Sequence, residues 1–223
     1  MNKLKPFLLF IFCWPILVSA QSITEFYQLL STYDNDIKIH QISKIGKQWQ
    51  ALDDQGQNLA LFVDEKNNFI ELKDKEEGGI FTLQVSLLKK RKGELLIALV
   101  KNHMDLFLHG EIHILRYQNG RFFDITDEVM PPINYQDFTE QNQSLATTAF
   151  SPELNQHLEF GFQLPKDGAP AYAKMQTDVI QNKCAQKDNS VIKYCQSLKE
   201  IAYSSIELIW NPKEGKFALG LKE

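Results

Sequence analysis

Short runs of alternating apolar and polar residues, separated by turn signals, fill most of the chain between residues 37 and 126. The clearest run spans residues 81–87, where apolar residues alternate with Thr82, Gln84 and Ser86. A period of two is typical of an antiparallel strand that buries one of its faces. The pattern therefore predicts an α+β protein in which antiparallel β-sheet predominates.

Two helices are expected beside this sheet. Ser22 and Glu25 have the spacing of a capping box, and apolar residues at helical spacing follow them, which predicts a short N-terminal helix. Apolar residues also share one face of a helical projection near residues 190–202. The second helix is predicted there, with Cys195 on its buried side.

The strand pattern is interrupted by prolines and polar residues between residues 131 and 155. We expect this segment to be an irregular connection. It would join a β-rich half with the N-terminal helix, residues 21–130, to a second β-rich half, residues 156–223. The two halves are either separate domains or parts of one continuous domain.

Two predicted hairpins have similar sequences. In each, a large aromatic residue, Tyr117 or Trp210, precedes a turn that ends in glycine, and a basic residue and a phenylalanine follow. The similarity has two interpretations. The aromatic residue packs across the strand pair in both hairpins, or the two β-rich halves arose by internal duplication.

The first twenty residues have the layout of a secretory signal peptide. Lys3 and Lys5 precede an apolar stretch, and the small residues Ser19 and Ala20 come just before Gln21. The stretch is shorter than the roughly 20 apolar residues that a membrane-spanning helix needs. We therefore expect residues 1–20 to be removed, which leaves a periplasmic or secreted protein without a membrane span.

Charge narrows the class of partner. The leader contains two lysines and no acidic residue, so its removal changes the formal net charge from −4 to −6. The basic run at residues 89–92 is followed by Gly93, which is typical of a hairpin turn. We expect no nucleic-acid partner, because such partners require a basic surface, and favour a cationic protein or an envelope component. The oligomeric state is left open.

Cleavage of the leader would also remove Cys13 and leave Cys184 and Cys195. Exported proteins fold in compartments that permit disulfides, so these two residues are predicted to form one structural bridge. A catalytic redox pair is the alternative, but the spacing is not that of Cys-x-x-Cys.

A metal site is the most specific chemical hypothesis that the sequence offers. His109, Glu111 and His113 alternate along a predicted strand and would project from one face. Two imidazoles and a carboxylate could hold Zn²⁺ with a position open for water. The alternative is a solvated sheet face, and we expect no cofactor on balance.

Two further groups of side chains have an ordinary structural explanation beside a functional one. Trp49, Tyr117 and Trp210 are candidates for a binding surface, although aromatic residues in hairpins commonly pack across the strands. The acidic residues around Thr126 could contact Ca²⁺, but a helix that starts with Thr126 as its N-cap explains them more simply.

Motifs for nucleophilic catalysis are missing from the sequence. Gly-x-Ser-x-Gly does not occur, and two Ser-x-x-Lys matches lack the Lys-Thr-Gly and Ser-Asp-Asn sequences that accompany them in penicillin-recognising enzymes. The sequence favours an exported, soluble, non-catalytic binding or interaction protein of the cell envelope or secreted space, with an inhibitor or immunity-like protein as one subtype. A secreted metal-dependent hydrolase and a structural envelope component are the alternatives.

Overall fold

The computed structural model describes residues 22–33, 39–76, 78–105, 108–140, 160–166, 169–176, 178–187, 192, 195 and 197–223. The predicted signal peptide lies outside the described residues, as do residues 141–155 of the expected connection. No helix in the described residues is long and apolar enough to cross a membrane.

Antiparallel strands dominate the described chain, as the sequence predicts. The helices are α1 (Ile23–Leu29), α2 (Thr126–Val129) and α3 (Asp178–Ala185), with short 3-10 helices at Leu30–Thr32, Tyr135–Phe138 and Ser197–Glu200. The strands are β1 (Ile42–Ile45), β2 (Gln48–Ala51), β3 (Ala60–Asp64), β4 (Phe69–Glu76), β5 (Gly79–Lys89), β6 (Leu95–Met104), β7 (Leu108–Gln118), β8 (Arg121–Asp124), β9 (Gly161–Gln163), β10 (Ala171–Lys174), β11 (Ser205–Asn211) and β12 (Lys216–Lys222).

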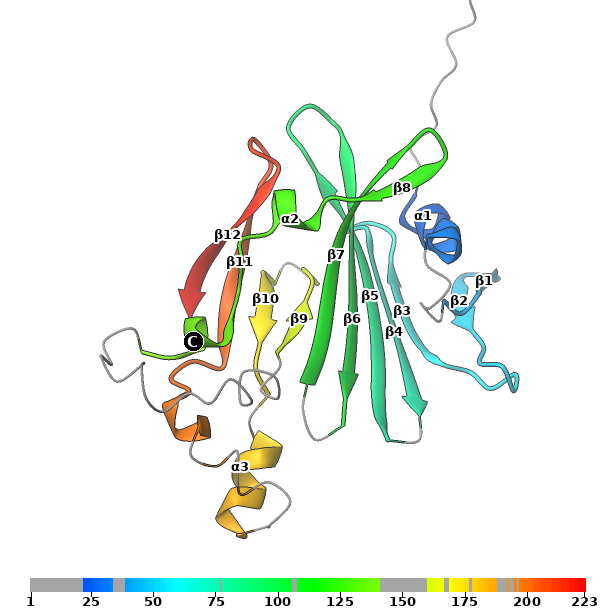
Figure 1. Ribbon diagram of the computed structural model, residues 1–223. Helices are drawn as coiled ribbons and strands as arrows, with labels where there is room; N and C mark the ends of the chain where they lie inside the picture. The colour runs from blue at the N-terminus through cyan, green and yellow to red at the C-terminus, as the bar shows by residue number, and fades with distance from the viewer. Residues whose placement is uncertain are drawn as a thin grey trace, which may run out of the picture.

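These strands form three sheets within the described residues. Strands β3 to β8 pair in sequence order in a six-stranded sheet, β9 to β12 do the same in a four-stranded sheet, and β1 pairs with β2. Figure 1 shows the six-stranded sheet in the middle, the four-stranded sheet on one side, and α1 with β1 and β2 on the other. The six-stranded sheet is therefore covered on both faces.

The first core lies between α1 and the six-stranded sheet. The predicted capping box starts the helix: Ser22 Oγ accepts the Glu25 N–H, and the Glu25 carboxylate accepts the Ser22 N–H at 2.7 Å. Alternate residues of β4 to β7 supply the facing side chains. The buried residues of this cluster are Ile23, Phe26, Tyr27, Leu30, Ile42, Ala51, Ile70, Leu72, Leu83, Val85, Ile97, Leu99 and Leu115.

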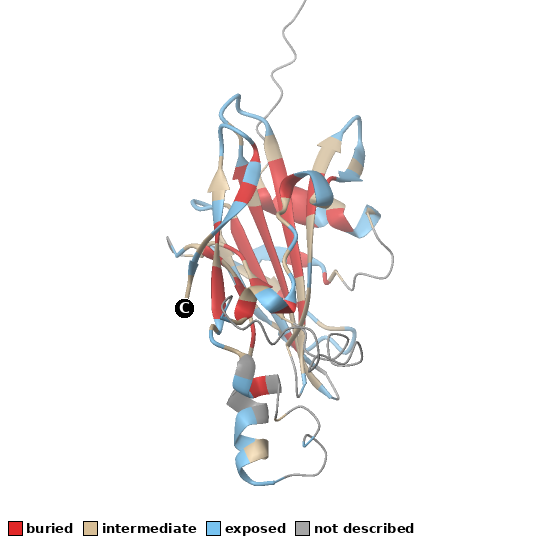
Figure 2. Cartoon of the chain, turned by 60° about the vertical axis from the view of Figure 1, so that its left-hand side comes forward, coloured by how far each residue is buried: buried red, intermediate tan, exposed pale blue. Residues whose placement is uncertain are grey.

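The second core lies between the two large sheets. It contains the other set of alternate residues from the six-stranded sheet, such as Ala98 and Val100, together with Ala173 and Ile206 from the four-stranded sheet. Figure 2 shows buried residues, in red, along the middle strands. Residues of both predicted halves thus belong to one continuous core.

Strand β9 crosses the inner face of the six-stranded sheet at a point where two glycines meet. A Cβ atom on Gly110 would overlap the Cα atom of Gly161, and a Cβ on Gly161 would overlap the side chain of Leu108. Glycine is required at such a close approach of two backbones. This contact brings β9 against β7.

A buried polar cluster continues the attachment of the segment that follows β9. Gln84 Nε2 donates to Glu71 Oε2 at 2.8 Å, and Gln84 Oε1 accepts the Leu164 N–H at 2.8 Å. Lys166 Nζ lies 3.1 Å from Glu71 Oε1. The two sheets are therefore joined by specific hydrogen bonds as well as by apolar packing.

Both predicted hairpins form, β7 with β8 and β11 with β12. Tyr117 is directly opposite Phe122, with ring centroids 4.8 Å apart, and Trp210 is directly opposite Phe217 at 5.1 Å. Asn119 has a positive φ of 54°, as the turn requires. The hairpins lie in different sheets, and a duplication of the two halves stays a prediction.

The α-helix predicted near residues 190–202 is not found among the described residues of that segment. The described residues of that segment contain a 3-10 helix at Ser197–Glu200 and no α-helix. Ala202 donates its N–H to the Phe138 carbonyl oxygen, and Thr139 bridges to Ile201. Extended pairing with the 138–139 backbone therefore excludes a helix that continues to residue 202.

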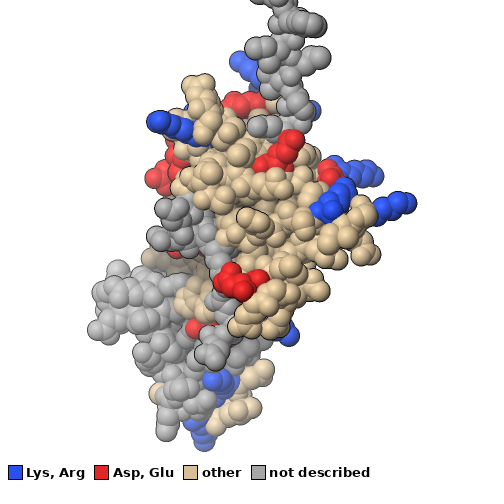
Figure 3. Space-filling model, turned by 90° about the vertical axis from the view of Figure 1, so that its right-hand side faces the viewer, with Lys and Arg blue, Asp and Glu red and all other residues tan. Residues whose placement is uncertain are grey.

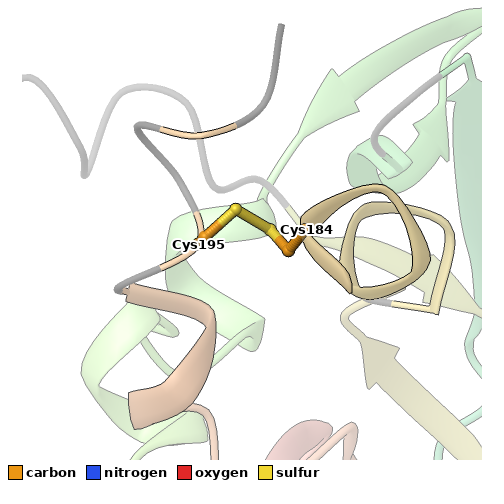
Figure 4. Close-up of a disulfide and its surroundings, with 2 residues drawn as sticks. All are labelled: Cys184 and Cys195. Atoms are coloured by element: carbon orange, nitrogen blue, oxygen red, sulfur yellow. A yellow bond between two sulfur atoms is a disulfide. The ribbon is translucent and has the colours of Figure 1, made fainter. Parts of the chain in front are cut away.

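The predicted disulfide joins Cys184 to Cys195, with their Cα atoms 5.6 Å apart. Cys184 lies in α3 and Cys195 lies in a turn, which reverses the expected arrangement of helix and loop (Figure 4). The apolar spacing of residues 191–202 predicted a helix that contains Cys195, whereas the described α-helix precedes that segment and contains Cys184.

Candidate ligand-binding cleft beside β7

The three candidate metal ligands lie on β7, at alternating positions on the face toward α1. His109 Nε2 is 3.7 Å from Asp105 Oδ1. Glu111 Oε2 is 2.7 Å from Lys101 Nζ on β6, and this contact is the main cause that lowers the pKa of Glu111. His109 and Glu111 therefore each have a charged partner of their own.

His113 lies between two carboxylates. Its Nδ1 is 2.8 Å from Asp124 Oδ2, and its Nε2 is 3.6 Å from Glu111 Oε2. Asp124 also accepts hydrogen bonds from the hydroxyl of Tyr33 at 2.9 Å and from the hydroxyl of Thr126 at 2.6 Å. Asp124 is thus a hub that connects β8 to β7 and to the end of the N-terminal helical segment.

These hydrogen bonds determine the ionisation of Asp124. Burial raises its pKa, but the hydrogen bonds from the Thr126 hydroxyl and N–H, from His113 and from Tyr33 outweigh burial and lower the pKa to about 2. A carboxylate that is stabilised in this way stays charged at neutral pH.

The side chains of His109, Glu111 and His113 do not converge as a metal site requires. The Glu111 carboxylate lies 2.7 Å from the Lys101 ammonium, a cation that competes with a metal ion for it, and His109 lies beside Asp105 instead of beside Glu111 or His113. Within the described ranges, no three His, Cys, Asp or Glu side chains gather so as to hold a metal ion. The structure brings Glu111 and His113 together in a chain of ion pairs, and pairs His109 with another residue.

The three candidate aromatic residues do not form one surface. Trp49 and Tyr117 pack against the cluster beside α1, whereas Trp210 packs against the core between the sheets and donates its indole N–H to the Lys89 carbonyl oxygen. Figure 3 shows the α1 side, where uncharged residues cover most of the described surface and acidic and basic residues are scattered. A charged binding face is not visible among the described residues on this side.

A cleft of about 390 Å³ opens on the other side of β7. Its lining combines one strand residue, the start of α2, the segment that follows α2, and two aromatic rings at the start of β9. The lining residues are Ile112, Thr126, Asp127, residues 130–133, Phe160 and Phe162. We name this feature the β7 cleft.

The β7 cleft exists because β8 is short. β8 pairs with β7 only over residues 115–118 of β7. The Ile125 N–H then donates to the Ile114 carbonyl oxygen, and the Thr126 hydroxyl accepts the Ile114 N–H at 2.8 Å. From there α2 leads the chain toward the four-stranded sheet (Figure 1), so β7 continues without β8 beside it.

The chemistry of the cleft is apolar with one acidic group. Pro131 and Pro132 give one wall a restricted backbone that lacks N–H donors. The Thr126 hydroxyl already donates to Asp124. Asp127 is exposed, and its carboxylate has no hydrogen bond or ion pair within the part of the chain that the structure describes. The arrangement can hold an apolar group beside a positive charge.

Sequence reasoning assigned the residues of this cleft to other roles. Thr126 is the first residue of α2 rather than its N-cap, and its hydroxyl accepts the Ile114 N–H of β7 instead. Met130 and Ile133 fell in or beside the expected irregular connection. The available signal was a pair of apolar side chains on either side of two prolines. An exposed connection does not need apolar side chains, so their presence indicated that this segment packs against the rest of the protein.

Comparisons with known proteins identify a similar fold and give no information on function. No protein-family model matches the chain, and no curated protein matches it. The fold is similar to a solved structure described as a domain of an uncharacterized protein from Porphyromonas gingivalis W83, with a TM-score of 0.53 and 11% sequence identity. The similarity covers 74% of this chain and 76% of that chain.

Proposed function

We propose that this protein is an exported, non-catalytic binding protein of the cell envelope or secreted space, and that the β7 cleft is its binding site. The observation that carries the proposal is the combination of an apolar cleft with the Asp127 carboxylate, which has no partner among the described residues. Ligand sites are commonly concave, mostly apolar and provided with a few polar groups that orient the ligand.

The other candidate centre is less suited to chemistry. His113 Nε2 is buried and makes no hydrogen bond within the described residues, so neither a substrate nor a water molecule reaches it in this conformation. A general base must come within hydrogen-bonding distance of the proton that it removes. The row on β7 is better explained as a set of structural ion pairs.

The proposed location rests on the leader sequence and on the disulfide. Structural disulfides persist in oxidising compartments such as the periplasm and the extracellular space. The bridge between Cys184 and Cys195 supports export, and the layout of residues 1–20 supplies a route.

The proposed partner is a cationic protein or a cationic envelope component. The chain has a formal net charge of −4, and the Asp127 carboxylate in the cleft lining has the same sign. Opposite charge on a partner would accelerate the encounter and favour the correct orientation. An inhibitor or immunity-like protein that binds a cationic enzyme is one form of this function.

A comparison of three forms of the protein tests the proposal. Wild type, Ile133→Glu and Ile209→Glu are each immobilised and exposed to the organism's own envelope extract and culture fluid at several salt concentrations. Ile133 lines the cleft, whereas Ile209 is a 48% exposed apolar residue of β11 outside it. We expect a component that wild type and Ile209→Glu retain and Ile133→Glu loses. Equal retention by all three forms would place the binding site elsewhere.

A further inference from the structure

The edge of β7 beside the cleft has backbone groups that make no hydrogen bond with any described residue. The N–H and C=O of Ile114 point away from β6, because they bond to Thr126 and Ile125. Successive residues of a strand direct these groups to alternate sides. Gly110 and Ile112 therefore direct their N–H and C=O to the same outer edge as Ile114.

At Gly110 and Ile112, this outer edge is not paired with any described strand. β8 pairs with β7 no further than residue 115, and no described residue hydrogen-bonds the outer groups of Gly110 or Ile112. Both residues are partly exposed, and Gly110 has no side chain to shield its backbone. Proteins usually block a free strand edge with charge, proline or a covering segment. Gly110 and Ile112 are neither charged nor proline, and β9 packs on the inner face of Gly110.

The edge and the cleft are continuous through Ile112, whose side chain lines the cleft while its backbone faces the edge. An extended segment that paired with this edge would direct alternate side chains to the same face as Ile112. Those side chains would enter the apolar cleft. The same face carries the carboxylate of Asp127, which has no partner within the described ranges and favours a cationic side chain two residues from an apolar one.

We propose that the partner contributes an extended peptide segment with a Lys or Arg two residues from an apolar side chain, and that this segment adds as a strand to the free edge of β7 at Gly110 and Ile112. The proposal rests on the proposed function of the β7 cleft and specifies how that site is used. Strand addition obtains its affinity from backbone hydrogen bonds and its specificity from pockets for alternate side chains.

Amide spectroscopy with defined peptides tests the proposal. The probe is the capped peptide Thr-Val-Thr-Lys-Thr-Val, added to the ¹⁵N-labelled protein expressed with its own leader. We expect the amide signals of Gly110 and Ile112 to shift and their hydrogen exchange to slow on binding. A peptide with Glu in place of Lys should bind more weakly, and Asp127→Asn should weaken binding of the Lys peptide about two- to fivefold, as for a partly exposed ion pair.

A backbone-methylated peptide separates this inference from the proposed function. Methylation of two consecutive central nitrogens removes the donor that faces β7, whichever edge of the peptide is used. We expect about tenfold weaker binding, as for the loss of one hydrogen bond. Equal binding of the methylated peptide would overturn strand addition while leaving the cleft as a binding site. Unchanged Gly110 and Ile112 signals with the parent peptide at millimolar concentration would also overturn it, whereas Ile133→Glu tests the cleft independently.

Discussion

The side chain of Asn102 pairs with the backbone of Phe162 through two hydrogen bonds. Nδ2 donates to the Phe162 carbonyl oxygen at 2.7 Å, and Oδ1 accepts the Phe162 N–H at 3.1 Å. Asn102 belongs to β6 of the six-stranded sheet and Phe162 to β9 of the four-stranded sheet. The Asn102 side chain therefore makes with the Phe162 backbone the two hydrogen bonds that a neighbouring strand would otherwise make. This pair positions one aromatic wall of the β7 cleft.

Replacement of Asn102 by alanine should destabilise the fold. The change leaves the buried N–H and C=O of Phe162 without partners, which should lower the free energy of unfolding by about 2–4 kcal/mol. Urea denaturation followed by intrinsic fluorescence measures the loss. Gln48→Ala, at an exposed position of β2, is the control and should change stability by less than about 0.5 kcal/mol. Equal stability of Asn102→Ala and wild type would show that the pair contributes nothing.

Stability should depend on pH through Asp124. Its pKa is lowered from the ordinary value of 3.8 to about 2 in the folded protein. The stabilisation is therefore complete above about pH 4 and is lost as the pH falls through the range from about 4 to about 2. Asp124→Asn should be less stable than wild type at neutral pH, and the difference should shrink in this acidic range.

Urea midpoints at a series of pH values measure the effect of Asp124. The matched control is Asp127→Asn, because the Asp127 carboxylate has no hydrogen bond or ion pair within the described residues. Its curve should run parallel to that of wild type. A parallel curve for Asp124→Asn as well would contradict the role of Asp124 as a hydrogen-bonded hub.

Loss of the disulfide should destabilise the protein by up to about 3 kcal/mol, since the bridge closes a short loop in the unfolded chain. Cys184→Ser, Cys195→Ser and the double variant should lose the same amount, because each removes the same bond. Thermal unfolding with and without reductant gives the comparison. Additive losses in the double variant would indicate that the thiols contribute through packing instead.

Metal analysis tests the zinc hypothesis for His109, Glu111 and His113 directly. Because the Glu111 carboxylate is already paired with Lys101, and no three such side chains gather within the described residues, we expect purified protein to contain far less than one zinc ion per chain, even after incubation with zinc salts. A stoichiometric ion that is lost in both His109→Ala and His113→Ala would instead support the metal-dependent hydrolase.

The fold could be predicted largely from local patterns. The capping box at Ser22 and Glu25, the alternation in residues 81–87 and the two hairpin turns are each determined by neighbours in the sequence, and each forms as expected. The helix near residues 190–202 was misplaced, because pairing of Ile201 with Thr139 is a contact between distant segments that periodicity does not reveal.

The candidate cleft could not be predicted from the sequence. Its walls come from β7, from α2 and the residues after it, and from the start of β9, and they meet only because Gly110 and Gly161 allow β9 to approach β7. The row of His109, Glu111 and His113 was correctly placed on one strand face. The partners that occupy these side chains, Asp105, Lys101 and Asp124, depend on the pairing register and on turn geometry.

The early end of β8 makes the β7 cleft easy to remove by insertion. A few β-forming residues added after Asp124 would let β8 continue beside Ile112 and Gly110 and would fill the vacant place in the sheet with the chain's own backbone. Such a lengthened protein would be self-complemented: it would keep both cores, and it would exclude from that place any segment supplied by another molecule. The length of a single edge strand would thus decide whether this sheet is complete by itself or is completed by a partner.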